Sequence, residues 1–140
     1  MLKTLAVWGS PGSGKSTVSL ALAWELVKDK QNVLVVNTDC TVPNLPVYLP
    51  MLKTNEDGNA SIGTVLDSAN RTQETLKNKI HLHEKSACLG FMALESGETP
   101  LSYKTFEKSK KYSFLKLLQA QPVDYIIFDC QSNPMYNNFT

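Results

Sequence analysis

The sequence lacks an excess of charge of either sign, because 14 Lys and Arg residues oppose 13 Asp and Glu residues and leave a formal net charge of +1. A nearly neutral chain has no global attraction for nucleic acid or for an anionic membrane. Arginine, the side chain best suited to paired contacts with phosphate, occurs only once, at Arg71. Direct binding to DNA or to a membrane is therefore not supported by this sequence.

Long apolar runs and paired cysteines are also missing. No stretch approaches the roughly 18 apolar residues of a membrane-spanning helix, and the N-terminus lacks the apolar core of a signal peptide. Cys40, Cys88 and Cys130 form no C-x-x-C pair, which argues against a zinc or redox motif. Since 42% of the 140 residues are hydrophobic, we expect one soluble, cytoplasmic domain over residues 1–140.

A glycine-rich stretch from Gly9 to Ser16, GSPGSGKS, fits the phosphate-loop pattern G-x-x-x-x-G-K-[ST]. Residues 2–8 before it indicate a strand and residues 16–30 after it indicate a helix. In that setting backbone N–H groups and a helix N-terminus point at a bound anion, whereas a flexible surface turn requires no such setting. We therefore predict a nucleotide site. Its expected residues are Gly9, Ser10, Pro11, Gly12, Ser13, Gly14, Lys15, Ser16 and Thr17.

Two side chains of this loop have expected roles in chemistry. Lys15 places a positive charge at the outer phosphates, where charge develops during phosphoryl transfer, so we assign it a catalytic role. Ser16 offers a hydroxyl ligand for Mg²⁺. ATP is the expected ligand and Mg²⁺ the expected cofactor.

Two aspartates stand where predicted strands end. Asp39 follows the apolar run 33–36, which closes a βαβ unit, and Asp129 ends the apolar run 124–129. Open α/β sheets bind ligands at the carboxyl ends of their strands, so Asp39 is a candidate catalytic residue and Asp129 a candidate Mg²⁺ ligand, directly or through water. On local grounds Asp39 is equally well explained as a turn or capping residue.

The segments between these strands have weaker patterns. Three prolines interrupt residues 41–60, which we interpret as a surface excursion with one short helical turn. Residues 61–69 and 72–79 favour short helices. Residues 102–119 favour a lysine-rich helix, whose basic face is more simply a solvent face than a nucleic-acid or membrane patch.

Alternation in residues 80–83 predicts a strand with His81 and His83 on one face. A metal site would need a third ligand, for which only Glu84 is close in sequence. We therefore interpret both histidines as facing solvent. The apolar residues 89–94 favour either another strand or a buried loop.

Three segments, in this order, resemble the MinD/ParA group of P-loop ATPases: Gly9–Thr17, Val33–Leu45 and Asp124–Asp129. The most specific match is Asp39, four intervening residues, Asn44 and Leu45. The resemblance implies an α/β fold with a P-loop NTPase-type parallel sheet flanked by helices. It also implies that Asp39 helps to position the attacking water and that Asp129 closes the Walker B strand.

Two features depart from the family pattern. Ser10 occupies the position where many members carry a second, signature lysine that reaches across a nucleotide-sandwiched dimer, and the stretch after Asp129 has no glycine to act as a pivot. Both features resemble the CpaE/TadZ branch of localisation factors more than the chromosome-partitioning branch. Family members continue through further strands, so we interpret the chain as the N-terminal portion of the domain.

These observations predict an ATP-binding switch ATPase of MinD/ParA type with slow hydrolysis and a localisation or partitioning role. A second copy of the chain and secretion, pilus or partition machinery are the candidate partners besides ATP and ADP. A non-hydrolysing ATP-binding scaffold is the first alternative, because Ser10 replaces the signature lysine. A small-molecule or nucleotide kinase is the second, although such enzymes use lid arginines and Arg71 is the only arginine.

Overall fold

The fold is taken from a computed structural model, which describes residues 1–39, 44–49, 65, 72–94 and 108–131. Strands and helices alternate along much of the chain, as the sequence predicts. In order, the elements are β1 (Lys3–Val7), α1 (Lys15–Lys28), β2 (Val33–Asn37), α2 (Leu45–Tyr48), α4 (Gln73–Lys77), β3 (His81–His83), β4 (Ser86–Met92), α5 (Lys108–Gln119) and β5 (Tyr125–Asp129).

The strands form one five-stranded sheet in the order β1-β5-β2-β4-β3. The pairs β1·β5, β5·β2 and β2·β4 are parallel, and β3 is an antiparallel edge strand with an irregular register after Leu82. The predicted P-loop NTPase-type parallel sheet flanked by helices is therefore confirmed. In register, Asp129 lies between Val7 of β1 and Asn37 of β2, so β5 brings its terminal carboxylate between two neighbouring strand ends.

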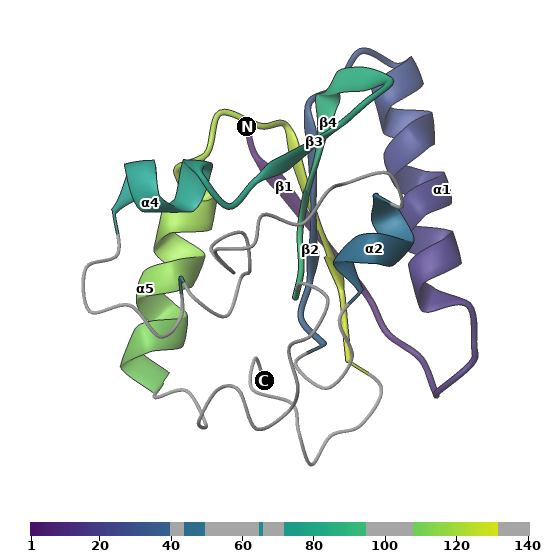
Figure 1. Ribbon diagram of the computed structural model, residues 1–140, viewed down its shortest axis with the longest axis horizontal. Coiled ribbons are helices and arrows are strands. Elements are labelled where there is room, and N and C mark those ends of the chain that lie inside the picture. Colours follow the sequence, from purple (N-terminus) through teal and green to yellow (C-terminus); the bar gives the residue numbers. More distant parts are fainter. Residues whose placement is uncertain (40–43, 50–64, 66–71, 95–107, 132–140) are drawn as a thin grey trace.

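Helices cover both faces of the sheet (Figure 1): α1 and α2 lie on one side, and α4 and α5 lie on the other. β2 is buried throughout because it runs through the middle of this sandwich. Its alternating side chains enter two hydrophobic clusters, Val33 and Val35 toward α1 and Leu34 and Val36 toward α5. This arrangement explains why residues 33–36 are apolar without alternation.

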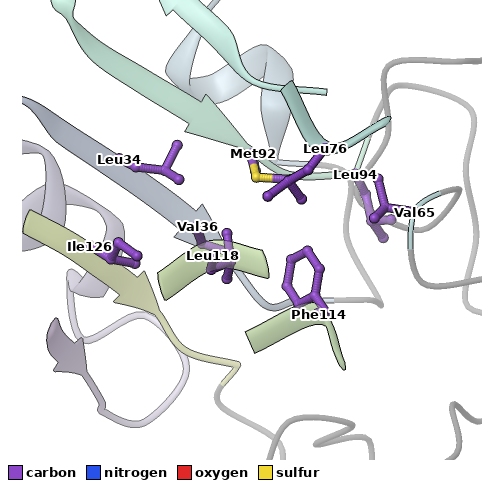
Figure 2. Close-up of a cluster of buried hydrophobic side chains, with 9 residues drawn as sticks. All are labelled: Leu34, Val36, Val65, Leu76, Met92, Leu94, Phe114, Leu118 and Ile126. Carbon is purple, nitrogen blue, oxygen red and sulfur yellow. The ribbon is translucent and has the colours of Figure 1, made fainter. Parts of the chain in front are cut away.

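Figure 2 shows the cluster under α5, where side chains from the sheet meet Phe114 and Leu118. These two residues lie four positions apart, on one face of the helix, and both are fully buried. Burying each such side chain stabilises the fold by about 1.5–3 kcal/mol. The cluster thereby fixes the segment that leads into β5 and its terminal aspartate.

Some shorter elements agree in type with the sequence predictions but differ in their bounds. β4 is a strand, which is one of the two alternatives that residues 89–94 left open, and it runs from Ser86 to Met92. The helix α4 confirms the helical character of residues 72–79, and the short α2 confirms a helical turn within 41–60, of which residues 44–49 are described. Of the predicted helix 61–69 only Val65 is described, and residues 101–107 also lie outside the described ranges.

The interpretation of the two histidines as solvent-facing is wrong. Leu82 is the exposed residue of β3, with 59% of its surface accessible, while His81 and His83 are half-buried. The ring of His83 packs edge-on against Trp24 of α1, with a centroid distance of 4.9 Å. The alternation correctly predicts that His81 and His83 lie on the same face of β3. It does not indicate that Trp24 of α1 packs against that face.

None of the helices within the described ranges is long and apolar enough to cross a lipid bilayer.

Candidate functional site

The phosphate loop connects the end of β1 to the first turn of α1. Gly12 and Gly14 have φ angles of 73° and 84°, a left-handed conformation that costs other residues about 1–2 kcal/mol. Gly14 is the residue before the helix, and its carbonyl accepts the N–H of Val18 at 2.9 Å. The pattern's glycine before lysine is thus required by the backbone geometry. Gly14 makes no side-chain cap hydrogen bond at the start of α1, and a helix N-terminus is a favourable place for an anion.

Lys15 turns back over the loop that it follows. Its Nζ donates to the carbonyl of Ser10 at 3.2 Å, while residues 11–14 are exposed to solvent. Ser10, the position of the absent signature lysine, therefore contributes its backbone to holding Lys15. The loop positions a cation at the helix N-terminus, where the macrodipole also favours negative charge.

Asp129 is the centre of the site. Its side chain is fully buried at the carboxyl end of β5, and Ser16 Oγ donates to its Oδ2 at 2.5 Å. Asn37 Nδ2 donates to the same oxygen at 3.2 Å, and the hydroxyl of Tyr48 donates to it as well. One carboxylate oxygen thus receives donors from α1, β2 and α2.

The second oxygen of this carboxylate, Oδ1, is buried and has no hydrogen-bond partner within the described ranges of the chain. A buried anionic oxygen without a partner is costly, and a cation or a cation-bound water would remove that cost. Mg²⁺ in nucleotide sites is bound by one or two carboxylates together with phosphate oxygens and water. The donor set of Asp129 and the Ser16 hydroxyl fits Mg²⁺, because Ser16 can donate its proton to Oδ2 and still offer a lone pair.

Asn37 was not among the residues predicted for the site. Its Nδ2 donates to Tyr48 Oη at 2.9 Å, and its Oδ1 accepts from the backbone N–H of Asp39 at 2.9 Å and from Asn44 Nδ2 at 3.3 Å. The amide therefore links the segment after β2 to Asp129. A polar residue at the end of an otherwise apolar buried strand was the available signal.

Tyr48 is the second residue that the sequence did not indicate. Its ring stacks on Phe91 with a centroid distance of 5.2 Å and an interplanar angle of 13°. Burial, reinforced by the negative charge of Asp129, raises the pKa of the Tyr48 hydroxyl well above its ordinary value. Tyr48 therefore remains a protonated donor to the carboxylate at neutral pH.

Asp39 lies at the same edge of the sheet, two residues beyond the end of β2, and is half-buried. The neighbouring Thr38 donates its backbone N–H to the carbonyl of Asp129 at 3.0 Å. The structure thus brings the phosphate loop, Asp39 and Asp129 to one edge of the sheet, as their sequence positions predict.

The segment after Asp129 contains a further buried polar group. Both side-chain amide atoms of Gln131 lack a hydrogen-bond partner in the part of the chain that the structure describes, and 3% of the residue is accessible. Cys130 lies between Asp129 and Gln131. Burial and the charge of Asp129 raise the pKa of its thiol, so the thiol stays neutral and poorly nucleophilic. Within the part of the chain that the structure describes, no group of three or more His, Cys, Asp or Glu side chains is placed to hold a metal by itself.

A cavity of about 290 Å³ lies away from this site. Its lining includes Asn32 and Gln121, which precede β2 and β5, and Gly90 of β4, which pairs in register with Leu34, the second residue of β2. The phosphate loop, Asp39 and Asp129 stand at the opposite, carboxyl ends. The cavity therefore belongs to a different end of the sheet from the nucleotide-site residues.

A family model described as Zeta toxin matches residues 3–85. The match covers more than half of the chain and includes the phosphate loop, α1 and β2. The chain belongs to this Zeta toxin family. Asp129, which completes the geometry of the site, lies beyond the matched residues.

Solved structures add the fold. The septum site-determining protein MinD of Pyrococcus horikoshii OT3, complexed with Mg-ADP, matches with a TM-score of 0.73 and 22% identity over 99% of this chain and 52% of that chain. Cobyrinic acid a,c-diamide synthase of Mycobacterium smegmatis, with bound ADP and magnesium, matches with a TM-score of 0.69 and 16% identity over 99% of this chain and 56% of that chain. The kinase domain of VpsO matches with a TM-score of 0.58 and 18% identity over 92% of this chain and 57% of that chain. A comparison with curated proteins gives no match.

This Zeta toxin family chain spans about half the length of the structures that it matches. The resemblance to MinD/ParA-type P-loop ATPases is confirmed at the level of the fold, because MinD is among these structures. Together the fold, the loop geometry and the family match identify a P-loop nucleotide-binding protein.

Proposed function

We propose that this chain is an ATP-binding switch ATPase of MinD/ParA type, which binds Mg·ATP, hydrolyses it slowly and serves localisation or partitioning. The observation that supports this proposal is the pairing of Ser16 with Asp129, a buried carboxylate whose Oδ1 finds no partner among the described residues. This pair joins the phosphate loop to the end of β5 and offers oxygen ligands for one divalent cation.

Each predicted site residue has a role in this proposal. The backbone of Gly9 to Thr17 cradles the phosphates, and Lys15 neutralises charge on the outer ones. Ser16 and Asp129 hold Mg²⁺, with Asp129 binding directly or through water, and Asp39 orients the attacking water. Bound Mg²⁺ supplies electrostatic stabilisation of the phosphate oxygens.

A switch requires that the state of the nucleotide site reach a surface. α2 meets this requirement, because Tyr48 contacts Asp129 on its inner side while Val47 is 60% exposed on its outer side. We infer that this short helix reports on the site to a second copy of the chain or to secretion, pilus or partition machinery. The cytoplasm, where ATP is available, is the proposed compartment, and residues 1–140 are proposed to be the N-terminal portion of a single P-loop ATPase domain.

The test is nucleotide binding by the chain and by its Lys15→Ala variant, measured with a fluorescent ATP analogue in the presence of Mg²⁺. Lys15→Ala should weaken binding at least about tenfold, since a charge-assisted contact to phosphate is lost. Lys28→Ala is the matched control, because Lys28 lies on the same helix in an exposed pair with Glu25, and it should bind as the parent does. Equal binding by all three proteins would overturn the proposal.

A non-hydrolysing ATP-binding scaffold is the first alternative, and Ser10 in place of the signature lysine favours it. Release of inorganic phosphate, measured on protein already shown to bind ATP, separates the two functions. Measurable turnover supports the ATPase, and tight binding without turnover supports the scaffold.

A small-molecule or nucleotide kinase is the second alternative, and the similarity in fold to the VpsO kinase domain motivates it. Transfer of labelled phosphate from ATP to a panel of nucleosides and metabolites tests it. Labelled organic product would favour the kinase, whereas labelled inorganic phosphate alone would favour the ATPase.

A further inference from the structure

The three donors to Asp129 Oδ2 come from different parts of the chain, and Tyr48 is the one that binding of a magnesium–nucleotide complex does not by itself require. Ser16 belongs to the phosphate loop, and Asn37 ends the neighbouring strand β2. Tyr48 reaches the carboxylate from α2, 81 residues away in sequence. A phosphate-loop site needs no tyrosine at this place, so its contact calls for an explanation.

The position of the Tyr48 hydroxyl is fixed from two directions. The ring lies against Phe91 at a centroid distance of 5.2 Å, and the hydroxyl accepts from Asn37 Nδ2 at 2.9 Å while donating to Asp129. Only 4% of the residue is accessible. A hydroxyl held in this way gives the carboxylate one orientation, because rotating the carboxyl group would break the bonds to Oδ2.

The two oxygens of the Asp129 carboxylate therefore differ in their hydrogen bonding. Oδ2 is occupied by three donors, and Oδ1 has none among the residues that the structure describes. Outer hydrogen bonds that orient a ligating carboxylate commonly change metal affinity about 10–100-fold when they are removed. The orientation of Asp129 therefore bears on how strongly a cation is bound.

We propose that Tyr48 is a positioning residue for the metal aspartate: it locks Oδ2 of Asp129 so that Oδ1 is the oxygen presented to Mg²⁺ or to its bound water. This inference rests on the proposed function, because it requires a magnesium–nucleotide complex at the site. It adds a specific dependence of cation binding on α2, the helix that carries the exposed Val47.

The variant Tyr48→Phe tests the proposal, since it removes one hydroxyl and keeps the ring on Phe91. ATP affinity is measured by fluorescence titration with Mg²⁺ and with EDTA, and the Mg²⁺ concentration for half-maximal tightening is measured at fixed ATP. We expect unchanged affinity in EDTA and about a tenfold higher Mg²⁺ requirement. Thermal melting monitors the fold, and Tyr112→Phe, at an exposed tyrosine of α5, is the control that should match the parent.

Two outcomes would overturn the proposal. An unchanged Mg²⁺ requirement in folded Tyr48→Phe would show that the hydroxyl does not position the carboxylate. An equal loss of affinity with Mg²⁺ and with EDTA would show a general structural role. If the parent and Tyr112→Phe themselves bind no ATP, the proposed function fails, and this result is distinct from both outcomes.

If Tyr48→Phe is unfolded at the temperature of the titration, the same Mg²⁺ titration on Asn37→Ser tests the proposal. That variant withdraws the Asn37 amide, which contacts both the Tyr48 hydroxyl and Oδ2. It should also raise the Mg²⁺ requirement, and an unchanged requirement would overturn the proposal.

Discussion

Ser16 Oγ donates to Asp129 Oδ2 at 2.5 Å across 113 residues of sequence. The parallel pairing of β1 with β5 makes this contact, because it places the end of β5 beside the loop that follows β1. A helix N-terminus, a lysine and a buried carboxylate thereby converge at one edge of the sheet. These groups can hold the phosphates and the cation of a magnesium–nucleotide complex.

Replacing Asp129 by asparagine should remove the effect of Mg²⁺ on ATP binding. The substitution keeps the shape of the side chain but removes the negative charge that attracts the cation. ATP affinity in EDTA should not fall, since Lys15 and the loop backbone remain. Calorimetric titration with Mg²⁺ and with EDTA measures both quantities. A variant that retained the full tightening by Mg²⁺ would contradict the assignment of this carboxylate.

Replacing Asp39 by asparagine should lower turnover more than binding. If Asp39 orients the attacking water, losing a group of this kind costs about 10²–10⁴-fold in rate, while the phosphate contacts stay intact. Phosphate release under saturating ATP measures the rate, and Asp29→Asn, at the exposed end of α1, is the control. Loss of ATP affinity with an unchanged rate would instead make Asp39 a binding residue.

Replacing Gln131 by leucine should stabilise the nucleotide-free protein. The amide is buried and both of its polar atoms lack a partner among the residues with described positions, a situation that costs about 1–3 kcal/mol. Leucine is apolar and similar in size, so the free energy of unfolding should rise by about 1 kcal/mol. Urea denaturation measures the change. A lower free energy of unfolding would mean that the amide has partners in solution.

Replacing Gly90 by alanine should destabilise the fold without altering nucleotide binding. A Cβ at this position would lie 2.8 Å from Cγ2 of Ile80, and overpacking of this kind costs about 1–3 kcal/mol. Gly90 lines the cavity described above, and β2 separates its strand, β4, from β5, which carries Asp129. A lower melting temperature with unchanged ATP affinity is expected. Weaker ATP binding would show that the two ends of the sheet are coupled.

The sequence predicts the parts of the site that depend on local pattern. The phosphate loop follows from its glycine, lysine and serine spacing, and the sheet follows from the apolar runs that become β2 and β5. Asp39 and Asp129 follow from the rule that parallel strands end at a common edge. Each of these inferences starts from a short continuous stretch of sequence.

The hydrogen-bond network around Asp129 was not predictable in the same way. Tyr48 and Asn37 meet the carboxylate only after α2 folds back onto the sheet, at sequence separations of 81 and 92 residues. A tyrosine in a proline-rich stretch carries no local signal for such a contact. The histidines of β3 were misplaced for a related reason, because the packing of Trp24 against His83 depends on tertiary structure.

Calorimetric titration of the chain with ATP, once with Mg²⁺ and once with EDTA, measures whether nucleotide binding depends on a cation held by Ser16 and Asp129. We expect saturable binding at one site per chain, with an affinity about tenfold or more higher in Mg²⁺, because Ser16 and Asp129 act through the cation. Absence of saturable binding, or equal affinity under the two conditions, would contradict this expectation.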